Sequence, residues 1–466
     1  RGDCQCQKGI PILGQIVYKN HRGFGKMNQA DILVYNGTIL TMDDQNKIIP
    51  DGLLAVSGNT IHYIGRGGKG SVSAEKELDA EGGLILPGLI NSHTHAAMTL
   101  FRGLADDLPL MDWLNNYIFP AEGKMDDDFV RVGTLLACAE MIMSGTTTFC
   151  DMYLFEEEVA RAAKEAGMRC LVGEVLYDFP SPNYGTVENG FIYTEALIER
   201  WKGDSLINIA VEPHSTFTCG VELLVKANDL ALRKGVPLIL HLAETREELE
   251  EIDKRFGKRP AQHLKDLGLL GPHLILDHCV HVSKSEIGLL AEHKVSVVHN
   301  PESNMKLASG IAPIPEMIAR GITVGLGTDG CASNNNLDLF GEMDMAAKLH
   351  KASKLDPTVM DAQTLIRMAT IDGARALGLG KITGSLEVGK RADLIVIDIN
   401  KPHLIPMYNP YSHIVYAASG HDVIHSIIDG RIVMEDRRLL TLDVEDIIGR
   451  SKEKSKKVRE WVGVLD

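Results

Sequence analysis

The sequence predicts an α/β protein built on a (β/α)8 TIM barrel, with a small β-sandwich domain contributed by both ends of the chain. Within about 300 residues, eight short apolar runs alternate with helix-length segments, which is the count of a TIM barrel. Nearly every run ends in an ionisable residue, and the carboxyl ends of barrel strands are where active sites form. An open doubly wound sheet is the alternative, but it leaves the ionisable strand ends unexplained.

The composition narrows the class of protein. The 466 residues are 44% hydrophobic and 24% charged, which is ordinary for a soluble globular chain. The net charge is −15, whereas a protein that binds duplex nucleic acid normally carries a basic face. We therefore expect no nucleic-acid partner. No apolar run approaches the roughly 18–20 residues that span a bilayer, so we expect no membrane partner. The scattered cysteines include no CxxC pair, which indicates buried thiols in a reducing, cytoplasmic compartment.

The two ends of the chain have the pattern of short strands and turns. Asn36-Gly37, Gly58-Asn59 and Asp429-Gly430 each indicate a hairpin. Two all-β fragments at opposite ends can form one domain, because chain termini often lie close together. Residues before Met27 fit neither pattern, and we interpret them as a leader or cloning-derived segment. We expect a leader at 1–26, sandwich strands at 27–86 and 385–440, a catalytic barrel at 87–384 and a C-terminal helix at 441–466.

The barrel region alternates strands with amphipathic helices. Segments such as 129–143 and 221–234 have helix length, and the shortest link still fits a helix at 284–293. After the barrel, residues 443–464 look like a surface helix whose solvated face includes Lys452–Lys457. The eight apolar runs end, in chain order, at His93, Asp151, Glu174, His214, His241, His278, His299 and Asp329.

Histidines and acids gather at these strand ends in a pattern that suits a metal ion. His93 and His95 form an H-x-H, in which both imidazoles face one side of a strand. His241, His278 and Asp329 end further strands, so three imidazoles and one carboxylate can meet at the barrel mouth. Such a set leaves coordination positions open for water, as catalytic metal sites do. Glu244, three residues after His241, is then the candidate proton shuttle. Each residue taken singly also fits a helix cap or a core hydrogen bond.

Four segments together resemble a known family: PGLINSHTH, HLAE, LDHCVH and GLGTDGCASNNNLDLFGEM. They resemble the amidohydrolase superfamily, and more closely its 5'-methylthioadenosine/S-adenosylhomocysteine deaminase group. The resemblance runs from about residue 31 to about residue 435 and implies a distorted TIM barrel with a split β-sandwich. Binuclear members carry a lysine at the end of strand four. This chain has AVEPHS there, which predicts a single divalent ion, Zn²⁺ or Fe²⁺.

The resemblance also implies a role for each residue at the predicted site. Glu244 and His278 would handle protons, with Asp329 counted among the catalytic residues. Glu122 would hold the ribose hydroxyls, which suits a carboxylate acceptor. Taken alone, Glu122 fits a helix N-terminal acid equally well. The metal ligands implied are His93, His95, His241 and Asp329, and the further substrate contacts are His214 with the purine and Trp113 near the thioether. Trp113 fits a core anchor equally well.

One stretch departs from the pattern of the group. Members that take S-adenosylhomocysteine use arginines after strand three to hold its carboxylate. Here the stretch at 174–190 has no Arg or Lys and instead carries Glu174, Asp178 and Glu188. Like charge opposes a substrate carboxylate, so we expect an uncharged 5' group to be preferred.

The sequence therefore predicts a metal-dependent deaminase whose partner is a small nucleoside: 5'-methylthioadenosine, 5'-deoxyadenosine or adenosine, with S-adenosylhomocysteine less favoured. The family is often oligomeric, so we expect a homo-oligomer. Two alternatives stay open within the same superfamily, an s-triazine chlorohydrolase or aminohydrolase and a guanine deaminase. A non-catalytic scaffold is the alternative from another class, but it would require a broken metal set.

Overall fold

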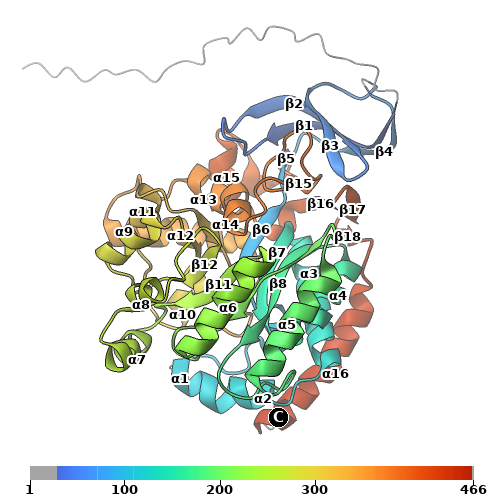
Figure 1. Ribbon diagram of the computed structural model, residues 1–466. Coiled ribbons are helices and arrows are strands. Elements are labelled where there is room, and N and C mark those ends of the chain that lie inside the picture. The colour runs from blue at the N-terminus through green and yellow to red at the C-terminus, as the bar shows by residue number, and fades with distance from the viewer. Residues whose placement is uncertain (1–28, 71, 109, 464–466) are drawn as a thin grey trace, which may run out of the picture.

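The computed structural model describes residues 29–70, 72–108 and 110–463, so the leader expected at 1–26 lies outside the described part of the chain. A barrel and a smaller sheet make up the described part, as Figure 1 shows. The smaller sheet lies at the opposite end of the barrel from α1 (Leu110–Trp113) and α2 (Phe119–Glu122). The predicted α/β fold, with a TIM barrel and a β-sheet domain from both chain ends, is confirmed.

The smaller sheet joins the two chain ends through its central strands. β5 pairs in parallel with β1 and antiparallel with β15, so the N-terminal and C-terminal fragments form one sheet. Val34, Leu54 and Leu394 belong to one buried apolar cluster, which gives the two fragments a common core. Within the described residues the sheet contains β1 (Ala30–Leu40), β2 (Ile48–Ser57), β3 (Thr60–Arg66), β4 (Ala74–Asp79), β5 (Leu84–Pro87), β15 (Leu394–Ile397), β16 (Val423–Ile428), β17 (Arg431–Glu435) and β18 (Arg438–Leu439).

Two of the three expected hairpins are present. β2 and β3 turn at Gly58-Asn59, and β16 and β17 turn at Asp429-Gly430. The prediction of a hairpin at Asn36-Gly37 is wrong, because β1 continues through this dipeptide with a shift of register against β2. Asn36 has φ +58°, and a Cβ on Gly37 would lie 2.9 Å from the Cβ of Ala80. The dipeptide therefore forms an irregularity that lets another segment approach β1 closely.

The barrel strands follow the predicted order with two differences. The run LILPGLINSH is not one strand, because it divides at Gly88 between the smaller sheet and the barrel. A Cβ on Gly88 would lie 2.1 Å from the Thr147 side chain, so only glycine fits this crossing. The fourth barrel strand consists of two short pieces. Among the described residues the barrel contains β6 (Leu89–Thr94), β7 (Thr146–Tyr153), β8 (Arg169–Leu176), β9 (Ile207–Ile209) with β10 (Glu212–Pro213), β11 (Leu238–Leu242), β12 (Leu274–His278), β13 (Ser296–His299) and β14 (Val324–Leu326).

Two sets of parallel strands close the barrel. One set runs β10-β8-β7-β6 and the other β11-β12-β13-β14. Isolated bridges join Val211 to Leu238 and Ser215 to His241, which links β10 to β11. On the other side, the Asp329 amide, just beyond the end of β14, donates to the carbonyl of His93 in β6 at 3.0 Å. Closure brings residues from both sets to one mouth.

Helices cover the barrel, and their bounds match several expectations. The segments expected at 129–143, 221–234 and 284–293 are helical as α3, α6 and α9. Within the described residues the helices and helical turns are η1 (Ala96–Phe101), α1, η2 (Leu114–Ile118), α2, α3 (Asp127–Met143), α4 (Glu156–Ala166), α5 (Val187–Trp201), α6 (Val221–Lys234), α7 (Arg246–Phe256), α8 (Pro260–Asp266), α9 (Lys284–Glu292), α10 (Pro301–Lys306), α11 (Ile314–Ala319), α12 (Leu339–Lys354), α13 (Ala362–Met368), α14 (Ile371–Ala376), η3 (Pro402–Leu404), α15 (Pro410–Tyr416), η4 (Gly420–Asp422) and α16 (Val444–Val462).

The C-terminal helix packs closely against the barrel. The face expected to be solvated at Lys452–Lys457 is only partly so, because Lys454 is buried and pairs with Asp126 and Asp128 near the start of α3. The lysine therefore fastens α16 to α3 rather than facing water. None of the helices in the described ranges has the length and apolarity needed to cross a membrane.

Candidate active site

A cavity of about 130 Å³ lies where the carboxyl ends of the barrel strands meet. Its wall combines residues from both strand sets with Trp113 and Glu122 from the segment after β6. His93 is fully buried, and its ring packs edge-on against the rings of His95 and His241, which line the cavity. The structure therefore brings together every residue that the sequence placed at the site. The predicted residues in the cavity wall are His95, Trp113, Glu122, His214, His241, Glu244, His278 and Asp329.

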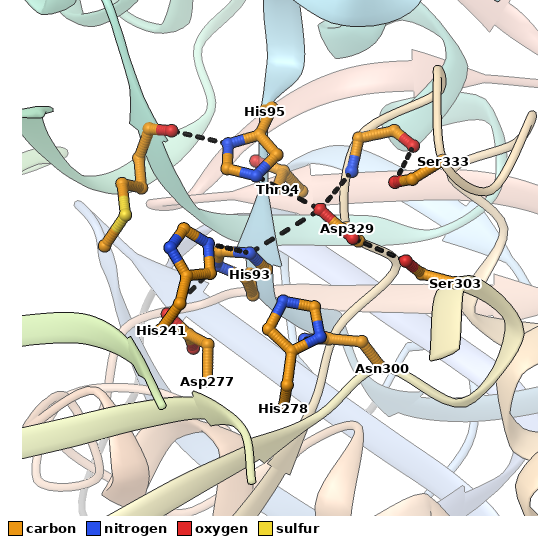
Figure 2. Close-up of polar contacts among 12 residues, drawn as sticks. His93, Thr94, His95, His241, Asp277, His278, Asn300, Ser303, Asp329 and Ser333 are labelled. Atoms are coloured by element: carbon orange, nitrogen blue, oxygen red, sulfur yellow. Dashed lines mark hydrogen bonds and ion pairs between the residues drawn. The ribbon is translucent and has the colours of Figure 1, made fainter. Parts of the chain in front are cut away.

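Three imidazoles and one carboxylate converge at the bottom of this cavity (Figure 2). His93 and His95 stand at the end of β6, and His241 lies in β11. The Nε2 atoms of His93 and His241 are 3.3 Å apart. Asp329 Oδ1 lies 3.1 Å from His95 Nε2 and 3.6 Å from His93 Nε2. Two overlapping groups have ligand-type atoms close enough together to hold a metal ion: His93 with His95 and Asp329, and His93 with His241 and His278.

The outer nitrogen of each imidazole has its own partner. His95 Nδ1 lies 2.5 Å from the Met152 carbonyl, and His241 Nδ1 lies 2.8 Å from the His214 carbonyl. His93 Nδ1 faces the Asp277 carboxyl at 3.2 Å. Carbonyls accept hydrogen bonds, so Nδ1 of the first two rings carries a proton and Nε2 is the atom that faces the cluster.

This tautomer makes the cluster fit a metal ion. The Nε2 atoms of His93 and His241 face each other at 3.3 Å, and a negatively charged oxygen of Asp329 lies near them. A divalent cation between these atoms would be coordinated by all three. The donor set of nitrogen and oxygen atoms suits Zn²⁺ or Fe²⁺.

Asp329 is held in place by α10 and by its own backbone. Ser303, in α10, donates its hydroxyl to Asp329 Oδ2 at 2.5 Å, and the Gly330 amide donates to Oδ1 at 2.8 Å. Asp329 has φ +63°, which is unusual for a residue with a side chain. Backbone strain of this kind is frequent at functional sites.

Glu244 and His278 form a second polar pair beside the cluster. Their Oε2 and Nε2 atoms are 4.0 Å apart. Burial raises the pKa of Glu244, while the nearby His278 opposes this shift. Burial lowers the pKa of His278, but the Glu244 and Asp329 carboxylates outweigh it and raise that pKa overall. A carboxyl group whose pKa lies above its ordinary value is suited to exchanging protons near neutral pH.

Glu122 lies at another part of the cavity wall. Its Oε1 accepts a hydrogen bond from the Tyr153 hydroxyl at 2.8 Å, while Oε2 accepts none from the described residues. Burial raises the pKa of Glu122 to about 7, against the effect of the Tyr153 hydrogen bond. His214 Nδ1 lies 2.9 Å from the Thr218 hydroxyl, and burial lowers the pKa of His214 to about 3. His214 is therefore a neutral imidazole at physiological pH.

The loop after strand three differs from expectation. The expectation that its three carboxylates oppose a charged substrate is not supported, because none of them lines the cavity. Asp178 caps the Gly220 amide, and Glu174 accepts hydrogen bonds from the Glu156 amide and the Asn183 side chain. The loop instead presents Tyr177 and Phe179, whose rings stack with centroids 3.8 Å apart.

Arg102 is not available as a substitute cation in this arrangement. Its guanidinium pairs with Glu140 and donates to the Asn335 carbonyl. Among the described residues, no lysine or arginine lines the cavity. The walls near Trp113 are therefore apolar and aromatic, with Phe119 6.5 Å from Phe179 between ring centroids.

Several supporting residues escaped the sequence reasoning. Tyr153, Asp277, Ser303 and Asn304 each contact a predicted site residue, and His278 Nδ1 lies 2.9 Å from Asn304 Oδ1. Asp277 and Tyr153 had a visible signal, since both are polar residues at the ends of apolar strands. Ser303 and Asn304 follow β13 in the short helix α10. Six residues are too few for their periodicity to show which side of the helix faces the site.

Comparisons with known proteins agree with this architecture. A model of the amidohydrolase family matches residues 84–433. The chain is 61% identical over 425 residues to the 5-methylthioadenosine/S-adenosylhomocysteine deaminase of Syntrophobacter fumaroxidans, covering 91% of this chain and 97% of that protein. It is 45% identical over 421 residues to the 5'-deoxyadenosine deaminase of Methanosarcina mazei, covering 90% of this chain and 96% of that protein.

Solved structures give the same picture of the fold. An adenosine deaminase from Xanthomonas campestris with bound zinc superposes with a TM-score of 0.91 at 37% identity, over 93% of this chain and 99% of that chain. An atrazine chlorohydrolase from Arthrobacter aurescens complexed with zinc reaches 0.85 at 24% identity, over 91% and 100% of the two chains. At that identity the second likeness shows the fold alone. The extent of the family match and the identity to full-length relatives establish that the chain belongs to the amidohydrolase family.

Proposed function

We propose that this chain is an enzyme that catalyses the metal-dependent hydrolytic deamination of an adenosine-type nucleoside, giving the inosine analogue and ammonia. The observation that carries the proposal is a single cavity that combines two features. One is the cluster of three histidines and Asp329, with Glu244 and His278 beside it. The other is Glu122, whose Oε2 is available to hydroxyl groups. Deaminases of 5'-methylthioadenosine and of 5'-deoxyadenosine among the relatives support the same reaction.

One divalent ion, Zn²⁺ or Fe²⁺, would be held by His93, His95, His241 and Asp329. When bound, such an ion acts as a Lewis acid that makes water a better nucleophile at neutral pH. The Nδ1 contacts of the three histidines support this ligand set, because they point each Nε2 lone pair inward. The stretch AVEPHS, which has no lysine at the end of the fourth strand, supports a single ion.

The chain's own residues then move the protons. Glu244 takes a proton from the attacking water and passes it to the purine ring nitrogen, while the oxygen bonds to C6. Glu244 then transfers the remaining hydroxyl proton to the amino group, so the C6–N bond breaks, the C6 carbonyl forms and ammonia leaves. His278 donates a hydrogen bond to the oxygen as its negative charge develops, and Asn304 keeps the ring oriented. Asp329 would act in catalysis as well as in metal binding, because it belongs to the proposed ligand set.

Three residues would recognise the nucleoside. Glu122 accepts hydrogen bonds from the ribose hydroxyls, with Tyr153 holding its other oxygen. His214 contacts the purine through Nε2, since its Nδ1 is engaged by Thr218. Trp113 is 5% exposed and lies beside the 5' group in the apolar part of the wall. The absence of lysine and arginine from the described wall favours an uncharged 5' substituent over S-adenosylhomocysteine.

The alternatives predict different substrates. An s-triazine chlorohydrolase or aminohydrolase and a guanine deaminase would have no use for Glu122 as a ribose acceptor, and a scaffold would not turn over. Ammonia release tests these alternatives across adenosine, 5'-deoxyadenosine, 5'-methylthioadenosine, S-adenosylhomocysteine, guanine and melamine. We expect 5'-methylthioadenosine or 5'-deoxyadenosine to give the highest kcat/KM. Turnover restricted to guanine or melamine would overturn the proposal.

A further inference from the structure

We propose that Asp277 is a positioning residue that holds His93 in the orientation and tautomer needed to bind the metal ion. This proposal rests on the metal site of the proposed function. Asp277 Oδ2 lies 3.2 Å from His93 Nδ1, and both side chains are fully buried (Figure 2). Neither carboxyl oxygen of Asp277 has a hydrogen-bond partner of good geometry among the described residues. The imidazole N–H of His93 is therefore the donor within its reach.

Local backbone geometry explains how Asp277 reaches His93. Side chains alternate along a regular strand, so Asp277 and His278 would normally face opposite sides of β12. His278 has φ +67° and the following Cys279 has φ +48°, which ends the regular strand at this point. The turn lets both side chains approach His93, whose ring centroid is 5.5 Å from that of His278.

The three histidines are not supported in the same way. His95 and His241 face the neutral carbonyls of Met152 and His214, whereas His93 faces a carboxyl group. A carboxylate on Nδ1 makes the opposite nitrogen a stronger electron donor than a carbonyl does. As an acceptor at Nδ1, the Asp277 carboxylate fixes the proton of His93 on that nitrogen.

The test compares zinc affinity and stability in the full-length chain. Zn²⁺ dissociation constants are measured at pH 8.5 by competition with a chelator for wild type, Asp277→Asn and Asp277→Leu. We expect about tenfold weaker binding for Asn, which keeps an acceptor, and about 100-fold for Leu, which does not. The metal-free Asp277→Asn chain should unfold at about the wild-type temperature, because the amide oxygen keeps an acceptor for the buried N–H of His93. A merely structural role would lower both quantities.

Glu212→Gln is the matched control. Glu212 is equally buried in β10, and both of its oxygens lack hydrogen-bond partners among the described residues. Its carboxylate neighbours are Asp151, Glu174 and Asp277, none of which belongs to the proposed ligand set. We expect this variant to bind zinc within twofold of wild type. Wild-type affinity in both Asp277 variants, or an equal loss in Glu212→Gln, would overturn the role of Asp277. A wild-type chain that binds no zinc would instead overturn the metal site of the proposed function, and the Asp277 role with it.

Discussion

The floor and the roof of the cavity are built in different ways. The floor consists of residues at or just after the ends of β6, β11, β12 and β14, held by contacts from β7, from the residue after β10 and from α10. The roof consists of the segment from Trp113 to Glu122 and the aromatic residues of the loop after β8. His93, His241, His278 and Asp329 in the floor are at most 6% exposed, whereas Phe119 and Phe179 in the roof are 38% and 44% exposed. The proposed function assigns the chemistry to the floor and the choice of substrate to the roof.

Among changes to the floor, removal of the metal ion is expected to reduce activity most. We expect dialysis against a chelator to abolish deamination of every substrate, and Zn²⁺ or Fe²⁺ to restore it. Elemental analysis of active protein should give about one divalent ion per chain. Two tightly bound ions per chain, or full activity after chelation, would contradict the ligand set of His93, His95, His241 and Asp329.

Glu244→Gln tests the floor with the metal site intact. The amide cannot exchange protons, so we expect kcat to fall by about 10²–10⁴ for all substrates. Zinc content should stay near that of wild type, because Glu244 is outside the ligand set. Glu247→Gln is the control, since Glu247 is an exposed acid in the first turn of α7 and lines no part of the cavity. A Glu244→Gln variant with full activity would assign the proton transfer to another residue.

The floor could be predicted from strand order, and Trp113 and Glu122 of the roof from the family resemblance, whereas the loop after β8 could not be predicted, for a physical reason. Parallel strands fix where their last side chains point, so His93, His241 and Asp329 could be placed together from chain order alone. In the roof, Glu174 and Asp178 had the right position in sequence but turn away to cap backbone amides. Loop side chains follow local hydrogen bonds that no periodicity encodes. For the same reason Asp277 was missed, because its facing depends on the positive φ of the next residue.

Glu122→Gln tests the part of the roof that is proposed to bind the ribose, because the amide is a weaker acceptor for hydroxyl groups than the carboxylate. A hydrogen bond to a charged group contributes about 1.5–3 kcal/mol, so we expect a loss of roughly 10–100-fold in kcat/KM for adenosine. Adenine has no ribose, and its slower turnover should be little affected. An equal loss for adenosine and adenine would contradict the ribose assignment.

The raised pKa of Glu122 predicts that the preference for adenosine over adenine depends on pH. Because burial raises that pKa to about 7, Glu122 is protonated at lower pH and becomes a carboxylate as the pH rises. The carboxylate accepts hydroxyl hydrogen bonds better, so the ratio of kcat/KM for adenosine to that for adenine should rise through about pH 7. Taking the ratio cancels groups that act on both substrates. In Glu122→Gln the ratio should be flat, and a rise that persists there would exclude Glu122 as its origin.

The smallest effect is expected at the outer edge of the roof. Phe179 stacks on Tyr177, and both line the apolar wall that would face the 5' group. An aromatic contact contributes about 0.5–1.5 kcal/mol beyond the area it buries, so Phe179→Ala should lower kcat/KM for 5'-methylthioadenosine by up to about tenfold. Adenosine has a smaller 5' group and should lose less, and Tyr408→Ala, at an 88% exposed site, should change neither.

Competition between two substrates in one tube measures this selectivity directly. With 5'-methylthioadenosine and S-adenosylhomocysteine together, the wild-type chain should consume the uncharged substrate faster, because a carboxylate at an apolar wall is desolvated without a partner. Phe179→Ala should narrow that preference by admitting water to the wall, while Glu244→Gln should slow both substrates and leave the ratio unchanged. Faster consumption of S-adenosylhomocysteine by the wild-type chain would show that a cation from outside the described wall reaches the 5' end. The roof would then select for charge rather than against it.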